Sequence, residues 1–256
     1  MGLTEILKAS GVSVRYGGVQ ALADVDLEVS DGELVGLIGP NGAGKTTFVD
    51  ALTGFVRYTG TVTLDGMDLA GLAPHRRARR GLARTWQSIE LFDDLTVWEN
   101  LAVGSGTSSV SGLARPSGAS ASEIERALDL VELAWAAELM PDELAQGQRK
   151  LVGVARAIAS EPRLLLLDEP AAGLDTGESE ELGRRLRALV QGGSSMLLID
   201  HDMGLVLAVC DRIVVLEFGK VIASGTPEEV RRDRRVVEAY LGSAGAELVD
   251  VTGDGR

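Results

Sequence analysis

The residues best suited to chemistry form a glycine-rich segment that fits the phosphate-binding pattern G-x-x-x-x-G-K-[ST] at every fixed position. The glycines would let the backbone pass close to phosphate oxygens. A helix that starts behind them would direct unpaired N–H groups at the anion. Lys45 would reach the β and γ phosphates, and the Thr46 hydroxyl would ligate Mg²⁺. The segment therefore predicts a nucleotide site built from Gly39, Pro40, Asn41, Gly42, Ala43, Gly44, Lys45, Thr46 and Thr47.

A second candidate is a pair of acids, Asp168 and Glu169, that directly follows four leucines. An open α/β sheet places its chemistry at the carboxyl ends of buried strands. Asp168 would hold Mg²⁺, through water, and Glu169 would lie beside the γ-phosphate and polarise the attacking water. The alternative is a core strand that ends in a solvated acidic turn. The phosphate-binding segment in the same chain favours the catalytic interpretation.

The elements around these residues predict an α/β fold. Leu34–Ile38 has the pattern of a buried parallel strand, and Thr46–Leu52 can open a helix behind the loop. Residues 4–65 alternate in short strands with turns, which predicts an N-terminal antiparallel β subdomain. From Arg163 onward strands alternate with helices, which predicts a parallel sheet.

The segment between these regions is expected to be a helical insert. We expect a nucleotide-binding core of residues 4–92 and 152–242, a helical subdomain of residues 93–151 and a flexible tail of residues 243–256. Residues 105–122 are rich in Ser, Gly and Ala and predict a mobile loop. Ser122 and Glu125 fit a helix-capping pattern at the end of that loop.

Composition limits the class of partner. The chain has 256 residues and a formal net charge of −13 that is spread along its length, which argues against nucleic acid bound to a basic face. Cys210 is its only cysteine, so no intrachain disulfide can form, which suits a reducing cytoplasm. No signal peptide is evident, and no apolar run approaches the ~20 residues of a membrane helix. We expect a protein soluble by itself, able to sit on a membrane protein.

Together these segments resemble the ATP-binding cassette (ABC) family from Leu7 to Gly242. The resemblance implies a P-loop NTPase (RecA-like) core with a helical insert, and hydrolysis of ATP coupled to transport. It also implies further roles: adenine stacking for Tyr16, contact with Mg²⁺ and the attacking water for Gln87, crossing to a partner subunit for the loop with Asp175, and γ-phosphate contact for His201. The catalytic set is then Glu169, His201 and Gln87, and the metal set is Thr46, Gln87 and Asp168.

The family's signature, Leu-Ser-Gly-Gly-Gln, appears in altered form. The resemblance assigns to it contact with the ATP held by a partner subunit. Ala145 lacks the usual hydroxyl, and a lost hydrogen bond to a charged group costs roughly 1.5–3 kcal/mol. That loss would weaken dimer closure, or mark one slow composite site in a heterodimer. The matching residues are Leu144, Ala145, Gln146, Gly147 and Gln148.

Within the family, the chain is most similar to the ATP-binding subunits of branched-chain amino acid importers. This branch implies transmembrane permease subunits, a second identical or different ABC ATPase, and indirectly a solute-binding protein, with no nucleic acid. It implies a cytoplasmic protein, peripheral on the inner face of the cell membrane, with a docking groove lined by parts of residues 86–101. Asp200 stands where the branch usually has Glu. The segments that carry the similarity are Ala83–Gln87, Leu91–Phe92, Leu95–Leu101, Leu144–Ala145, Ala171–Leu174, Ile199–Met203, Gly225–Pro227 and Ala239–Gly242.

Three other functions stay open at this stage. An ATPase of a lipid or lipopolysaccharide exporter would suit the same motifs. A soluble cassette ATPase, for example a cluster-assembly scaffold, would lack a membrane partner. A P-loop GTPase switch is a different class, but the chain has no Asn-Lys-x-Asp segment to read guanine.

Overall fold

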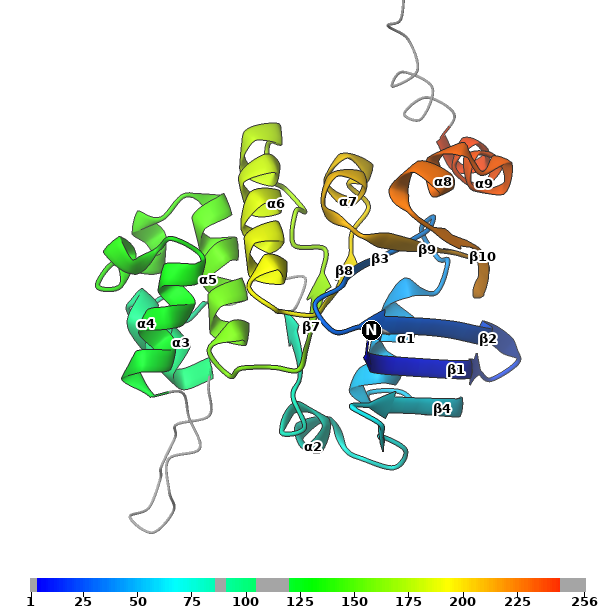
Figure 1. The fold of residues 1–256 in the computed structure, drawn as a ribbon, viewed down its shortest axis with the longest axis horizontal. Helices are drawn as coiled ribbons and strands as arrows, with labels where there is room; N and C mark the ends of the chain where they lie inside the picture. Colours follow the sequence, from blue (N-terminus) through cyan, green and yellow to red (C-terminus); the bar gives the residue numbers. More distant parts are fainter. Residues whose placement is uncertain (1–3, 86–90, 105–119, 245–256) are drawn as a thin grey trace, which may run out of the picture.

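A six-stranded sheet forms the centre of the protein (Figure 1). The structure is a computed structural model, and it describes residues 4–85, 91–104 and 120–244. The strand order is β10-β9-β3-β8-β7-β6. The pairs β9–β3, β3–β8, β8–β7 and β7–β6 are parallel, and β10 is antiparallel to β9. This arrangement confirms the predicted parallel sheet. The strands are β3 (Leu34–Ile38), β6 (Leu82–Thr85), β7 (Leu164–Asp168), β8 (Met196–Ile199), β9 (Arg212–Glu217) and β10 (Lys220–Gly225).

A second sheet, antiparallel and of order β2-β1-β4-β5, lies beside the first. Its two long strands alternate buried and exposed positions, because one face packs on the core while the other meets solvent. It confirms the predicted antiparallel subdomain. Its strands are β1 (Glu5–Tyr16), β2 (Val19–Ser30), β4 (Thr59–Leu64) and β5 (Met67–Asp68).

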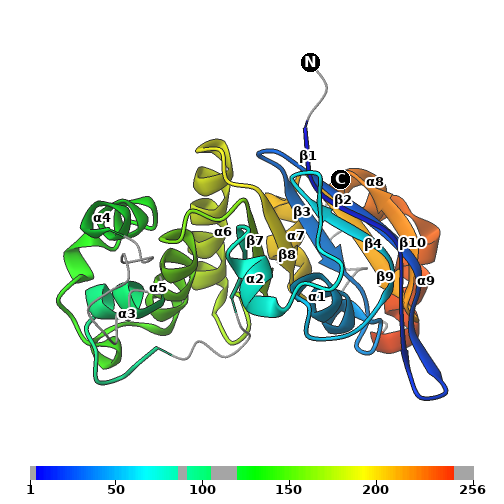
Figure 2. The ribbon, with the colours of Figure 1, turned by 90° about the horizontal axis from the view of Figure 1, so that it is seen from below.

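The helices fall into layers. The helices α6 and α7 cover one face of the central sheet, and α1 with the antiparallel sheet covers the other, while α3, α4 and α5 form a group beyond α6 (Figures 1 and 2). The helices are α1 (Lys45–Thr53), α2 (Pro74–Ala78), α3 (Val97–Gly104), α4 (Ala121–Leu130), α5 (Gln146–Ile158), α6 (Thr176–Gln191), α7 (Met203–Val209), α8 (Pro227–Arg232) and α9 (Arg234–Ala244), with short 3₁₀ turns at Ala134–Ala136 and Pro141–Glu143.

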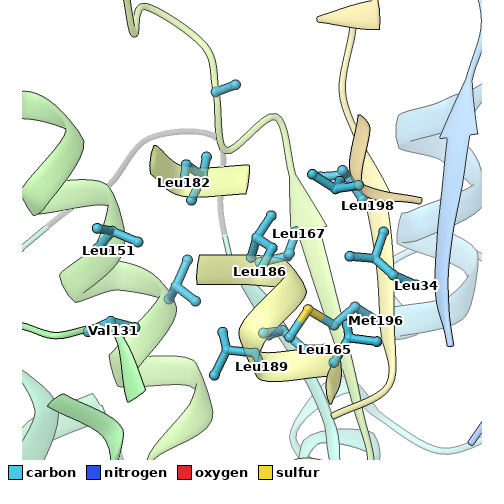
Figure 3. Close-up of a cluster of buried hydrophobic side chains, with 14 of the residues drawn as sticks. Leu34, Val131, Leu151, Leu165, Leu167, Leu182, Leu186, Leu189, Met196 and Leu198 are labelled. Carbon is cyan, nitrogen blue, oxygen red and sulfur yellow. The ribbon is translucent and has the colours of Figure 1, made fainter. Parts of the chain in front are cut away.

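Two hydrophobic clusters sandwich the central sheet, because successive side chains of a strand point to opposite faces. On β7, Leu165 and Leu167 belong to the cluster with α5 and α6, whereas Leu164 and Leu166 belong to the cluster with α1 and the antiparallel sheet. Figure 3 shows the first cluster, where Leu186 of α6 lies against Leu165 and Leu167 of β7. A strand buried on both faces explains the unbroken run of leucines.

Three element boundaries differ from the sequence expectations. The helix α5 runs through residue 151, so one helix belongs to both the expected core and the expected insert. The N-cap of α4 is Ser120 and not Ser122, and Ser120 forms the capping box with Glu123. The backbone of α9 extends to Ala244, two residues into the expected tail, and residues 245–256 lie outside the described residues.

Candidate functional site

The carboxyl ends of three neighbouring strands, β3, β8 and β7, bring most of the predicted residues that the structure describes to one edge of the central sheet. The glycine-rich loop follows β3, Asp200 and His201 follow β8, and Asp168 and Glu169 lie at the end of β7. Residues 86–90, which follow β6, lie outside the described residues, so the structure does not place the predicted Gln87 or its neighbour Trp86. Segments far apart in the sequence therefore meet where an open α/β sheet binds its ligands.

The backbone of the loop adopts conformations that require glycine. Gly39 has φ 152°, and a Cβ atom on it would lie 2.1 Å from the carbonyl oxygen of Leu216. Gly44 has φ 105°, and a Cβ atom there would lie 2.9 Å from the carbonyl oxygen of Ala21. Gly42, at φ 79°, has open space around the same position. The chain therefore wraps tightly at both ends of the loop and leaves its middle free, which is the shape of an anion cradle.

Lys45 is folded back over this cradle. Its Nζ donates hydrogen bonds to the carbonyl oxygens of Gly39, at 2.5 Å, and Pro40, at 3.1 Å. Burial lowers the pKa of Lys45, and the charges of Glu169 and Asp168 act in the opposite direction. The ammonium group thus lies between the loop and the two acids, where it can meet a phosphate.

The remaining loop residues differ in exposure. Gly44 begins α1 without a side chain to cap the helix, so the first N–H groups of α1 face the loop. Thr46, in the first turn of α1, is exposed, whereas Thr47 is half-buried. Asn41 is exposed. Thr46 is thus accessible from solvent, as the predicted role of its hydroxyl requires.

Arg84, on β6, holds the predicted metal ligand Asp168. Its Nη2 donates to Asp168 Oδ2 at 2.6 Å, and its Nη1 donates to Asp50 Oδ1 at 2.7 Å. The backbone N–H of Asp168 donates to Thr85 Oγ1 at 3.3 Å. The sequence assigns Arg84 no role of its own, because nothing in a linear pattern pairs residues 84 positions apart.

Glu169 and His201 face each other across the strand ends. Glu169 has φ 48°, a conformation that non-glycine residues rarely adopt, and its N–H donates to the carbonyl oxygen of Ile199 at 2.6 Å. Its Oε2 lies 3.8 Å from Nδ1 of His201, whose side chain is 61 % exposed. Strained backbone of this kind gathers at functional sites. The two predicted catalytic side chains that the structure describes are therefore adjacent.

Asp200 is the buried centre of this edge, with 1 % of its surface exposed. Its Oδ1 accepts the N–H groups of His201, at 2.7 Å, and Asp202, at 3.0 Å, and its Oδ2 accepts that of Ala171, at 3.0 Å. Burial raises the pKa of Asp200, and these backbone donors oppose the shift. One carboxylate therefore joins the segment of His201 to the segment that leads to Asp175.

The predicted signature segment starts α5. Leu144 is buried, and the N–H of Ala145 donates to Gln148 Oε1 at 2.9 Å. The N–H of Gly147 donates to Glu178 Oε1 at 3.0 Å, and a Cβ on Gly173 would lie 3.0 Å from the Nε2 atom of Gln146.

Glu178, in the first turn of α6, also contacts the end of the predicted partner-crossing loop. Asp175 is the N-cap of α6: its Oδ1 accepts the N–H of Glu178 at 2.8 Å, and its N–H donates to Glu178 Oε2 at 3.3 Å. Lys150 of α5 is buried nearby; burial lowers its pKa, and the charges of Asp200, Glu169 and Glu178 oppose this. The signature segment and the loop with Asp175 are thus connected within one chain. The sequence offers no sign of these contacts.

Two aromatic residues bear on the nucleotide site, one predicted from the sequence and one shown by the structure. Tyr16, the predicted adenine-stacking residue, ends β1 and is half exposed. Tyr240, on α9, was given no role from the sequence. Burial raises the pKa of Tyr240 to about 12, and the backbone of Gly39 opposes this, which places the phenol beside the first glycine of the loop. The C-terminal helix therefore supports the loop.

The described residues fit a magnesium ion that is bound together with a nucleotide. No group of three His, Cys, Asp or Glu side chains within residues 4–85, 91–104 and 120–244 could hold a metal ion by itself. Mg²⁺ usually keeps several waters and binds through one or two carboxylates plus substrate phosphates. Asp168 and Thr46 provide donors of that kind. They lie on β7 and α1, which Arg84 links through its hydrogen bonds to Asp168 and Asp50.

Comparison with protein families decides the identity of this fold. A model of the ABC transporter family matches residues 22–172, and a model of the branched-chain amino acid ATP-binding cassette transporter matches residues 220–246. The chain belongs to the ABC transporter family. This confirms the family, fold and ATPase class that the sequence predicted, and an ABC ATPase domain binds ATP.

Individual relatives of this ABC protein agree. It is 41 % identical over 251 residues to the high-affinity branched-chain amino acid transport ATP-binding protein BraF of Pseudomonas aeruginosa, covering 93 % of this chain and 98 % of BraF. It is 37 % identical over 241 residues to the lipopolysaccharide export system ATP-binding protein LptB of Escherichia coli, covering 92 % and 97 %. A nucleotide-free ATP-binding cassette from an ABC transporter superposes with a TM-score of 0.82 at 29 % identity, over 93 % of this chain and 99 % of that one.

Proposed function

We propose that this ABC protein is the ATP-hydrolysing subunit of an importer of branched-chain amino acids or a related small polar solute. The observation that carries the ATPase function is the meeting of the glycine-rich loop, Asp168, Glu169 and His201 at one sheet edge. The match of residues 220–246 to the branched-chain transporter model, together with the similarity to BraF, favours this substrate class over lipopolysaccharide export.

The residues of the loop bind and orient the triphosphate. The N–H groups at the start of α1 meet phosphate oxygens, and Lys45 exchanges the carbonyl oxygens of Gly39 and Pro40 for the β and γ phosphates. Tyr16 stacks on adenine. Mg²⁺, held by Thr46, Asp168 and Gln87, would neutralise charge on the phosphate oxygens.

Glu169 and His201 act on the water that attacks the γ-phosphate. The Glu169 carboxylate accepts a hydrogen bond from this water and orients it, which is the task of a general base in this geometry. His201, 3.8 Å from Glu169, contacts the γ-phosphate. Asp200 holds the backbone at His201 in place from below.

The signature residues Leu144–Gln148 complete the site of a second subunit. Two copies, or this chain and a different ABC ATPase, pair head to tail, so that each ATP lies between the loop of one subunit and the signature segment of the other. Asp175 lies at the crossing point. Because the phosphate charge bridges both surfaces, hydrolysis opens the dimer, which is a two-state switch.

Membrane partners follow from the same assignment. None of the helices in the described part of the chain is long and apolar enough to cross a bilayer. In this proposal permease subunits supply the membrane path, and this protein docks on them from the cytoplasm through the predicted groove lined by parts of residues 86–101. A solute-binding protein takes part only indirectly, through the permease.

Two substitutions in the purified chain test the ATPase assignment. Lys45→Ala should abolish hydrolysis and weaken ATP binding, since the cradle loses its cation. Glu169→Gln should retain ATP binding but stall hydrolysis and yield a stable dimer in ATP, seen by size-exclusion chromatography. Matched controls are Lys8→Ala and Glu161→Gln, which alter exposed surface ion pairs. Wild-type turnover in either site variant would refute the role of that residue.

The substrate class needs a separate experiment with the complete transporter. The chain and its co-purifying membrane subunits are placed in proteoliposomes with the solute-binding protein. Leucine, isoleucine or valine should stimulate ATP hydrolysis and accumulate on the side of the membrane that holds the ATPase subunit. Stimulation by lipopolysaccharide instead would replace the import assignment and leave the ATPase assignment intact.

A further inference from the structure

The guanidinium of Arg84 forms a two-ended fork within the core of the site. One nitrogen binds Asp168 and the other binds Asp50, at 2.6 and 2.7 Å. The side chains of Arg84 and Asp168 are each 7 % exposed, and that of Asp50 is 26 % exposed. A planar guanidinium presents donors in a fixed geometry, so it constrains two carboxylates at once in a way that a lysine cannot.

The two carboxylates belong to the two elements that carry the proposed metal ligands. Asp50 lies one helical turn after Thr46 on α1. Asp168 is itself a proposed ligand at the end of β7. The fork therefore links the helix that presents the Thr46 hydroxyl to the strand that presents the carboxylate.

The fork also fixes one side of the Asp168 carboxylate. Arg84 binds its Oδ2 atom, and the Asp168 backbone N–H is bonded to Thr85, the neighbour of Arg84 on β6. The strands β6 and β7 pair in parallel with Thr85 opposite Leu167. Two successive residues of β6 thus hold the backbone and the side chain of one predicted metal ligand.

We propose that Arg84 is a positioning residue for the magnesium site, which sets the orientation of Asp168 and its distance from α1. This inference rests on the proposed binding of Mg·ATP. It predicts that the geometry of the fork, and not merely its positive charge, governs how well the ion binds.

Charge alone makes the opposite prediction. A cation beside a metal ligand repels Mg²⁺, so its removal should strengthen metal binding if Arg84 acted only by charge. Arg84→Lys keeps the charge but loses the fork, and Arg84→Met removes both. Asp50→Asn keeps Arg84 on Asp168 but weakens its link to α1. Arg163→Met is the matched control, because it removes an arginine–aspartate pair, with Asp65, at the surface.

The experiment measures binding of a fluorescent ATP analogue to the full chain, first in EDTA and then at rising Mg²⁺. Electron paramagnetic resonance of free Mn²⁺ reports metal binding directly. In EDTA, all variants should bind the analogue as the wild type does, since the loop is unchanged. The Mg²⁺ concentration at half-effect should rise at least tenfold in Arg84→Lys and Arg84→Met and about threefold in Asp50→Asn, with no change in Arg163→Met.

Each contrary result has a distinct meaning. An unchanged or lower Mg²⁺ midpoint in Arg84→Lys overturns the inference. A lower midpoint in Arg84→Met also overturns it, because that result shows that Arg84 acts on the ion only through its charge. If Arg84→Met does not fold, Arg84→Lys and Asp50→Asn decide. A wild-type chain that fails to bind the analogue with Mg²⁺ would refute the proposed function, whereas normal wild-type binding with unaltered variants refutes only the role of Arg84.

Discussion

Replacing Asp200 by asparagine tests whether one buried carboxylate organises the catalytic edge. An asparagine side chain has one oxygen, so it can keep the donors of His201 and Asp202 but must present its NH₂ group to the N–H of Ala171. A buried donor left without an acceptor costs about 1–3 kcal/mol. The neutral amide is cheaper to bury than the carboxylate, so we expect a loss of about 1–2 kcal/mol near neutral pH.

The pH dependence of the free energy of unfolding follows from the direction in which the pKa of Asp200 is shifted. Because burial raises this pKa in the folded protein, the favourable contribution of Asp200 is fully present below its unfolded-state pKa and is lost as pH rises through the folded value. Asparagine does not titrate. The destabilisation caused by Asp200→Asn should therefore be larger at pH ~4, the ordinary pKa of an aspartate, than near pH 8.

Urea and thermal unfolding at both pH values measure this effect. A loss of about 1–2 kcal/mol corresponds to a fall of about 2–8 °C in the melting temperature for a chain of this size. Asp129→Asn, at an exposed position, should change stability by less than about 0.5 kcal/mol. Equal losses of stability at the two pH values, or no loss at all, would refute the idea that the buried Asp200 carboxylate organises this edge.

Two further substitutions test the cradle and the core. Gly39→Ala should reduce the affinity for an ATP analogue more than tenfold, because the new Cβ would lie 2.1 Å from the carbonyl oxygen of Leu216. The control Gly18→Ala, where a Cβ meets open space, should leave the affinity unchanged, and equal titration curves for the two variants would contradict the cradle geometry. Leu186→Ala removes a fully buried side chain between α6 and the sheet and should cost about 2–5 kcal/mol in urea unfolding; a smaller cost would show that the cluster of Figure 3 can collapse around the cavity.

The sequence predicted the sheet and the strand ends because those features are local. A run of aliphatic residues followed by acids, as at Leu164–Glu169, describes a buried strand and its exit, and the glycines of the loop mark a turn that only they can form. Once the parallel order is assumed, the carboxyl ends must meet. The predicted gathering of the loop, Asp168, Glu169 and His201 therefore needed no knowledge of distances.

Contacts between side chains distant in sequence could not be predicted in this way. Arg84 is 34 residues from Asp50 and 84 residues from Asp168, and no periodic pattern links them. Glu178 and Gly147 meet only because α5 and α6 start side by side. At the start of α4, the pattern of a capping box fits both Ser120 with Glu123 and Ser122 with Glu125, and the sequence does not decide between them.

The continuity of α5 limits how the helical group can move. The helix has 13 residues and is about 20 Å long, with the signature segment at one end, and its side chains pack both on α4 and on the central sheet. A rigid rod clamped by two bodies offers no hinge at that crossing. Any swing of the helical group relative to the sheet must bend the chain elsewhere or carry the buried half of α5 with it, so the predicted signature segment and the part of α5 packed on the sheet must move as one piece.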